Sequence, residues 1–332
     1  MPTLLGALRS LAMTPSLKDV SFAGRKFPVR PSAVTRRLEA IPQAVVCGFE
    51  WAIDARTLWE VERRLDLVDP EFRGFAYEGA TMAYTVRDAI AGGRGGQARE
   101  LLAGPGQPHI FLTYIGIGFA LARLPRPLWR NALPDLGTTP YYPTMSWLVI
   151  DGLGFDRAYF DTEKWVVRQA RPKPYPWQGY AGYFARAWDQ GVGRALWFIH
   201  GADIDAVIAA VERFAPDRHA DLWSGVGLAA TFAGGASAEQ LTRLRAATGE
   251  YAADLAQGAV FAAKARSFSG CEPEHSAAAI RALSGLDIGH AARMADDIAA
   301  GGLTATEDVP EYEIWRSLVR TELSPSRAHS PG

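Results

Sequence analysis

Apolar residues recur at helical spacing along most of this chain. Ser32 is suited to be an N-cap, and the apolar positions after it share one helical face: Val34, Leu38 and Ile41. The same spacing predicts helices over residues 57–67 and 70–90, the second of which opens with Pro70. Later helices are predicted over residues 180–199, 204–214, 217–232, 238–247, 251–267, 274–283, 288–299 and 311–322. No long run alternates β-branched and polar residues, so we expect no substantial sheet.

Proline marks the segments that interrupt this pattern. Residues 1–31 carry Pro15, Pro28 and Pro31 and predict an irregular N-terminal segment. Residues 32–322 then form one α-helical domain, and residues 323–332 form a flexible tail. The stretch 171–179 (RPKPYPWQG) holds three prolines, which keep its backbone extended. It is the candidate boundary at which two halves of the domain would meet.

A glycine recurs in similar apolar surroundings. The positions are Gly79, Gly116, Gly152, Gly191, Gly225, Gly258 and Gly289, with spacings of 37, 36, 39, 34, 33 and 31 residues. A period of about 30–40 residues is the length of one helix–turn–helix unit. Glycine within a helix costs up to about 1 kcal/mol relative to alanine, so its repeated use predicts close helix–helix approach. We therefore expect a mainly α, helical-repeat domain of α-solenoid or α/α ring-like type. The alternative is that an Ala- and Gly-rich chain shows such spacings by chance.

The residue before each glycine is polar in most cases. In order, these residues are Glu78, Ile115, Asp151, Gln190, Ser224, Gln257 and Ile288. If the glycine-bearing helices face inward, their side chains converge on one interior, where a carboxylate needs a partner. Candidate partners are Arg73, Arg123, Arg194 and Lys264. The alternative is that the polar residues cap helices or pair locally.

Aromatic residues are abundant, with 10 Trp, 11 Tyr and 15 Phe, and many lie beside these polar positions. Aromatic walls with a few polar groups are typical of a pocket for an apolar, conjugated or polycyclic ligand. Ordinary core packing is the alternative. The candidate ligand-contacting residues are Tyr77, Tyr114, Tyr159, Gln190, Arg194, Trp197, Trp223, Gln257 and Lys264.

Composition excludes several classes of protein. The net charge of -1 offers no basic field for nucleic acid. The six histidines form no i, i+4 pair, and no phosphate loop or nucleophile elbow occurs, so we expect no metal and no cofactor. Cys47 and Cys271 lack a CxxC partner and are expected to be buried free thiols. The most apolar run, Ile110–Ala122, has 13 residues where a membrane span needs about 20. Without a secretory signal, the chain is expected to be a cytoplasmic protein with no membrane span.

Long segments of the chain resemble a bacterial family catalogued as domain of unknown function 1702. They are RGFAYEGATMAY, LLAGPGQPHIFLTYIGIGFALARLP, DGLGFDRAYF, AWDQGVGRALWFIHGAD, RHADLWSGVGLAATFAGG and LAQGAVFAAKAR. The resemblance extends from about Leu8 to Leu318. Members of that family are mostly actinobacterial and occur in natural-product gene clusters, notably those for enediyne polyketides. There they accompany the synthase that makes a linear conjugated polyene. The resemblance supplies no catalytic residues.

The resemblance implies a natural-product biosynthesis protein that acts on or binds a polyene-derived polyketide intermediate. Acid–base or cyclisation chemistry would suit the candidate carboxyls Glu78, Asp151, Asp189 and Asp221, provided that burial raises their pKa values. Arg194 would hold a carboxylate or an enolate-like oxygen. One alternative is a non-catalytic binding or chaperone protein that docks on the polyketide synthase. Another is a terpene-cyclase-like enzyme that uses aromatic rings to steady cations.

Overall fold

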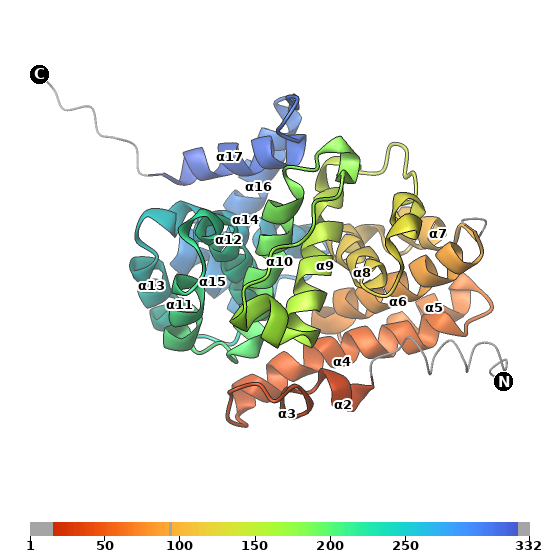
Figure 1. Cartoon of the computed structure of the whole chain (residues 1–332), viewed down its shortest axis with the longest axis horizontal. Helices are drawn as coiled ribbons and strands as arrows, with labels where there is room; N and C mark the ends of the chain where they lie inside the picture. The colour runs from red at the N-terminus through yellow and green to blue at the C-terminus, as the bar shows by residue number, and fades with distance from the viewer. Residues whose placement is uncertain (1–15, 93–94, 325–332) are drawn as a thin grey trace, which may run out of the picture.

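Seven helices pack side by side in chain order, and we call them the helix row. They are α4 (Ala33–Ile53), α6 (Pro70–Ile90), α8 (Ile110–Leu121), α9 (Leu148–Phe160), α10 (Phe184–Ile199), α12 (Pro216–Ala233) and α14 (Ala252–Phe268). The most extensive helix–helix contacts of the molecule link successive members of this row. In Figure 1 the colour accordingly passes from orange α4 and α6 through green α9 and α10 to teal α12. The computed structural model describes residues 16–92 and 95–324, and no strand occurs within them. The mainly α prediction is therefore confirmed.

Glycine sets the spacing between these helices. Each predicted glycine from α8 onward faces the carbonyl oxygen of the residue before the glycine of the preceding helix: Gly116 faces Glu78, Gly152 faces Ile115, Gly191 faces Asp151, Gly225 faces Gln190 and Gly258 faces Ser224. A Cβ at these positions would lie 1.9 to 2.4 Å from that oxygen, a distance that real side chains do not reach. Only glycine allows such backbone contact, in which Cα–H groups approach carbonyl oxygens.

The seventh glycine of the predicted series is an exception. A Cβ on Gly289, in α16 (Ile288–Ala300), would meet only side-chain atoms, at 3.3 and 3.4 Å. Ile288 before it is partly exposed, although an inward-facing position was predicted. The buried face of α16 is made instead by alanines, namely Ala291, Ala292 and Ala295. The prediction is therefore wrong for Gly289, because its spacing along the sequence does not reflect a close neighbour.

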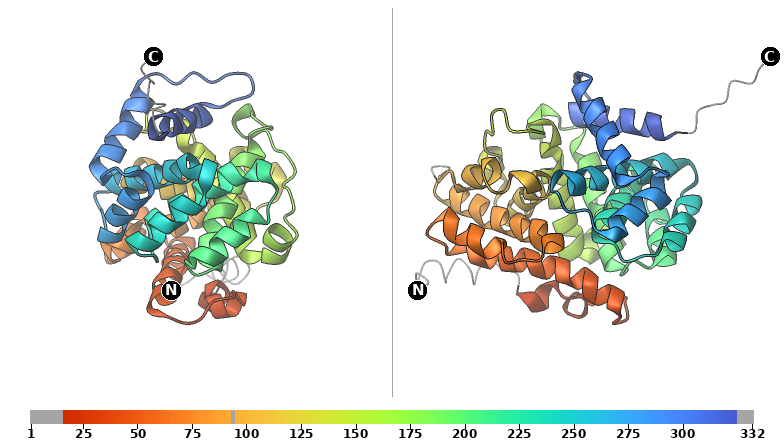
Figure 2. Two further views of the ribbon diagram at one scale, coloured as in Figure 1. Left: turned by 90° about the vertical axis from the view of Figure 1, so that its left-hand side faces the viewer. Right: turned by 180° about the vertical axis from the view of Figure 1, so that it is seen from behind.

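The helix row is curved, so its early helices face its late ones. The ring centroids of Phe75 in α6 and Phe232 in α12 lie 5.3 Å apart. The rings of Phe111 in α8 and Phe261 in α14 lie at the same separation. Figure 2 shows this curvature from the end and from behind. Helices distant in sequence therefore surround a common interior.

Other elements connect and cover the helix row. They are the helices α5 (Leu58–Leu65), α7 (Gln97–Ala103), α11 (Ile204–Glu212), α13 (Ala238–Ala247), α15 (Glu274–Ser284) and α17 (Glu311–Leu323), with the short 3-10 or π segments η1 (Gln107–His109), η2 (Arg126–Asn131), η3 (Thr144–Trp147), η4 (Glu163–Val167), η5 (Trp177–Gly179) and η6 (Gly249–Tyr251). The proline-rich stretch 171–179 joins α9 to α10, which pack directly on each other within a single compact domain. Helix α17 extends to Leu323, one residue into the predicted tail, and residues 325–332 lie outside the described residues.

The N-terminal segment is more ordered than its prolines indicate. Residues 16–31 contain two one-turn helices, α2 (Leu17–Val20) and α3 (Phe22–Arg25), whereas an irregular segment was predicted. Buried Phe22 and Phe27 fix this segment to the body, and residues 1–15 lie outside the described residues.

Two further expectations concern the cysteines and the membrane. Cys47 and Cys271 are free, as expected, but both are partly exposed rather than buried. In the described part of the chain, no helix is both long and apolar enough to cross a membrane.

Candidate functional site

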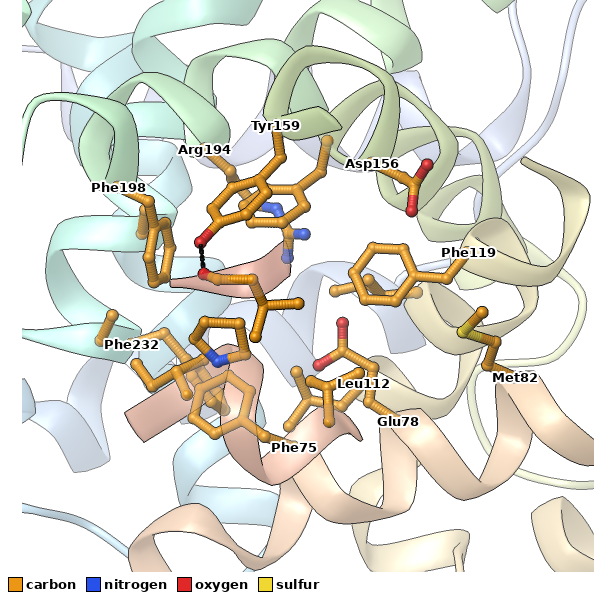
Figure 3. Close-up of a pocket in the computed structure, with 18 of the residues that line it drawn as sticks. Phe75, Glu78, Met82, Leu112, Phe119, Asp156, Tyr159, Arg194, Phe198 and Phe232 are labelled. Atoms are coloured by element: carbon orange, nitrogen blue, oxygen red, sulfur yellow. Dashed lines mark hydrogen bonds between the residues drawn. The ribbon is translucent and has the colours of Figure 1, made fainter. Parts of the chain in front are cut away.

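The curved helix row encloses a cavity whose walls are mostly apolar (Figure 3). About 1000 Å³ in it is free of protein atoms, counting the open space at its mouth, and about 90 Å³ can be reached by the centre of a water molecule. Every helix of the row contributes at least one phenylalanine: Phe49, Phe75, Phe111, Phe119, Phe155, Phe198, Phe232 and Phe261. A cavity of this size and lining suits an apolar small molecule.

Four charged side chains line the cavity among the described residues. Arg123 and Asp156 form an ion pair with each other. Arg194 Nε lies 2.9 Å from Oδ1 of buried Asp151, close enough for an ion pair although the atoms are not aligned as a hydrogen bond. The fourth is Glu78, whose carboxyl has no ion pair or hydrogen bond within the described part of the chain. Among the described residues, it is therefore the one unpaired carboxyl on the cavity wall.

Burial dominates the electrostatics of Glu78. Its side chain is 3% exposed, and desolvation raises its pKa from 4.5 to about 8. Nearby Arg194 opposes this rise in pKa, whereas Asp151 adds to it. Figure 3 shows the carboxyl turned toward the cavity, between Phe119 and Leu112. A carboxyl with this pKa is mostly protonated at neutral pH and can both give and take a proton there.

The other four polar residues that precede glycines meet behind the cavity. Gln190 Nε2 donates to Asp151 Oδ2 at 2.8 Å, and Ser224 Oγ donates to Gln257 Oε1 at 2.9 Å. Helix α17 completes this network, because Arg316 Nε donates to Gln257 Oε1 at 3.1 Å. These four residues are buried but are not on the cavity wall. They bind one another and α17, and only Glu78 and Ile115 of the series face the cavity.

The carboxyls of Asp189 and Asp221 also lie away from the cavity, although they were grouped with Glu78. Asp189 accepts two hydrogen bonds from Arg218, at 2.6 and 2.9 Å, and burial raises its pKa to about 6. Asp221 pairs with Arg186 at 2.9 Å and with Arg316 at 2.7 Å. These ion pairs join α10 to α12 and α12 to α17. Their geometry is that of structural links between helices.

Some of the candidate ligand-contacting residues line the cavity, and the others lie away from it. Tyr159 and Arg194 line the cavity. The rest of the set, Tyr77, Tyr114, Trp197, Trp223, Gln190, Gln257 and Lys264, does not. Trp197 Nε1 donates to a backbone carbonyl at 2.8 Å, and Lys264 Nζ bonds Asp296 at 2.7 Å. These side chains pack between helices because successive residues of a helix point in different directions, about 100° apart.

The residues that line the cavity recur at fixed distances in sequence from the predicted glycine of each helix. In α6, α8, α9, α10, α12 and α14, the residue three positions after the predicted glycine is on its wall: Met82, Phe119, Phe155, Arg194, Leu228 and Phe261. From α8 to α14 the residue seven positions after the glycine is also there: Arg123, Tyr159, Phe198, Phe232 and Ala265. The positions before, three after and seven after the glycine form one i, i+4 stripe. Phe198 and Phe232 were not predicted to line the cavity, although this i, i+4 periodicity in the sequence is the signal that identifies them.

Comparison with known proteins places the chain in a family. No curated protein and no solved structure matches it. A family model described as protein of unknown function (DUF1702) matches residues 4–323. Because this match covers nearly the whole sequence, the chain belongs to the DUF1702 family.

Proposed function

We propose that this protein binds a polyene-derived polyketide intermediate in the cavity and transfers a proton to and from it. The observation that carries the proposal is Glu78, an unpaired carboxyl with a pKa near 8 on an aromatic wall. The family resemblance supplies the substrate class, a linear conjugated polyene or its cyclised product. Flat aromatic walls suit such a molecule because they bury its apolar faces.

The proposed chemistry is an isomerisation or a cyclisation. Protonated Glu78 donates its proton to the polyene, and the double-bond electrons form the new C–H bond. Aromatic rings such as Phe119 and Phe155 stabilise the resulting cation. In a cyclisation, a second double bond of the same molecule attacks this cation, and its electrons form the new C–C bond. The Glu78 carboxylate, stabilised by Arg194, then takes a proton from a neighbouring carbon, and those C–H electrons re-form a double bond. No electrons are gained or lost, so the cycle is balanced without a redox partner.

The arrangement of the helices and the cellular location of the protein are part of the same proposal. A shorter helix separates several successive members of the row, as α7, α11 and α13 do. We therefore propose an α/α ring-like repeat in which each unit supplies wall residues to one cavity. The protein would work in the cytoplasm beside the synthase that supplies its polyene.

The decisive experiment compares the wild type with Glu78→Gln. Both would be expressed with a polyene-forming synthase, and the products would be separated and identified by mass spectrometry. Binding of a purified polyene would be measured by fluorescence. We expect Glu78→Gln to bind the polyene as the wild type does but to form no product. Glu272→Gln is the control, because this exposed carboxyl lies outside the cavity.

Each other result points to a different function. Product formation that survives Glu78→Gln would favour a binding or chaperone protein. Turnover of farnesyl diphosphate would favour the terpene-cyclase-like alternative. Failure of the wild type to bind any polyene would refute the proposal.

A further inference from the structure

Among the described residues, one buried arginine lacks the ion pair with a carboxylate that the other buried arginines form. Arg194, Arg218, Arg266 and Arg316 are the buried arginines of the described chain. Three of them form ion pairs with aspartates, at 2.9, 2.6 and 2.7 Å respectively. Arg266 has no carboxylate within ion-pair distance in residues 16–92 and 95–324. A buried charge is costly when unpaired, so this exception calls for a physical reason.

Backbone groups hold the Arg266 guanidinium in place. Nη1 donates to Glu71 O at 3.0 Å, Nη2 donates to Phe232 O at 2.7 Å, and the group lies 3.9 Å from the centroid of the Phe232 ring. Its Nε has no hydrogen-bond partner, although the side chain is only 3% exposed. These two carbonyls, of which Phe232 O lies at the end of α12, offset part of the positive charge. They leave one buried N–H unsatisfied, and burial lowers the pKa of Arg266 to about 10.

Arg266 lies on the wall of a second, smaller pocket. Pro70, Gly74, His109 and Ser269 also line this pocket, and His109 and Ser269 are its other polar side chains. It has about 270 Å³ free of protein atoms, of which about 10 Å³ can be reached by the centre of a water molecule. The part that a water molecule can reach is about the size of one water, so this pocket has room for no more than the end group of a ligand. Four residues line both this pocket and the main cavity: Phe111, Leu112, Phe232 and Ala265.

We propose that the two pockets together take one amphiphile, a conjugated polyene that carries a single carboxylate. The carboxylate binds the Arg266 guanidinium beside His109, and the apolar chain lies along the aromatic cavity. This inference rests on the proposed function and names its substrate class more closely. Arginine is suited to this role because its planar N–H groups match the geometry of a carboxylate.

The proposal also fixes which part of the ligand meets Glu78. Glu71, whose carbonyl binds Arg266, and Glu78 are seven residues apart in α6. Seven residues span about 10 Å along a helix. Glu78 therefore faces the middle of the chain rather than its head, and proton transfer would occur at a carbon remote from the carboxylate.

The experiment uses the full chain and two matched probes. One is trans-parinaric acid, a linear conjugated tetraene with a carboxylate, and the other is the corresponding primary alcohol. Fluorescence titration would give both affinities for the wild type and for Arg266→Gln. The control is Arg87→Gln, because Arg87 also donates to two backbone carbonyls, Ala52 O and Ala55 O at 2.8 Å, but lines neither pocket.

We expect the wild type to prefer the acid, and Arg266→Gln to weaken acid binding by about ten- to a hundredfold, the size of a charge-assisted hydrogen bond. Binding of the alcohol should change by less than about twofold in both variants, and Arg87→Gln should bind both probes as the wild type does.

Equal wild-type affinity for acid and alcohol would overturn this inference while leaving the proposed function intact. An equal loss of both probes in Arg266→Gln would show that Arg266 only caps α12 and would also overturn it. Binding of neither probe would refute the proposed function itself. The wild-type comparison needs no variant, so it decides the matter even if Arg266→Gln does not fold.

Discussion

Glu78→Gln removes the unpaired carboxyl of the cavity and keeps its shape. The pKa of this carboxyl is about 8 in the folded protein, against an ordinary value of 4.5 in an unfolded chain. Between these two values, the folded protein keeps a proton that the unfolded chain releases. Stability therefore falls as the pH rises through this window, and the full loss is reached above about pH 8. Glutamine carries no such proton, so the variant escapes this loss.

The size of the effect follows from the two pKa values. One pKa unit corresponds to about 1.4 kcal/mol, so the full difference is roughly 4–5 kcal/mol. The free energy of unfolding of Glu78→Gln should exceed that of the wild type by an amount that grows with pH. Its slope should be about 1.4 kcal/mol per pH unit between about pH 5 and about pH 7.5.

Urea denaturation at a series of pH values, followed by tryptophan fluorescence and circular dichroism, measures this difference directly. Subtracting the wild-type value at each pH cancels the titration of the groups that do not interact with Glu78. Glu272→Gln, which alters an exposed carboxyl outside the cavity, is the control. A flat difference for Glu78→Gln would refute the reasoning, because it would mean that the Glu78 carboxyl ionises in the folded protein as it does in the unfolded chain.

Other predictions test the packing around the cavity. Gly191→Ala would place a methyl group 1.9 Å from a carbonyl oxygen of α9 and should cost about 3 kcal/mol or more in urea denaturation. Gly289→Ala, whose nearest contact is 3.3 Å, should change stability by no more than about 1 kcal/mol, and equal losses would contradict the argument from glycine. Asp189→Leu should cost about 3–5 kcal/mol in the same assay because it leaves buried Arg218 unpaired. A double variant that also carries Arg218→Met should recover part of this loss of stability, and no recovery would count against the ion pair. Tyr159→Phe removes a 2.5 Å hydrogen bond to a carbonyl of α2, so it should cost about 1 kcal/mol and speed tryptic cleavage within residues 16–31. Unchanged cleavage would show that this bond does not hold the segment in place.

The helices themselves were predictable from local patterns. The predicted spans 70–90 and 238–247 coincide with α6 and α13. Ser32 caps α4 as expected, because its side chain accepts a hydrogen bond from Thr35 N. Helix α10 begins at Phe184 rather than at residue 180, since the residues after the proline-rich stretch form turns first. Capping and hydrophobic periodicity act within a few residues, so they can be read without knowledge of the fold.

The glycine spacing was also local information, but it has a limit. A helix that touches a neighbour at backbone distance must carry the small residue in its own sequence, as Gly191 and Gly225 do. Gly289 has similar spacing and no such neighbour. The sequence therefore indicates where close contact is possible, and only the packing determines where it occurs.

By itself, the sequence determined the helices and the glycine positions at which close contact is possible. The tertiary structure decided which of these contacts form, which stripe of each helix faces the cavity and how far along each stripe the cavity extends. In α6 and α8 the residue before the glycine faces the cavity, as Glu78 does. In α9 to α14 the residue before the glycine lies one helical turn away from the cavity wall, because α17 packs against the helices at that level. Arg316 and Tyr312 of α17 bind the polar side chains at these positions. Helix α17 carries no glycine signal and follows the row in the chain. The division between an unpaired carboxyl on the cavity wall and a structural network behind it therefore depends on a long-range contact that no local pattern records.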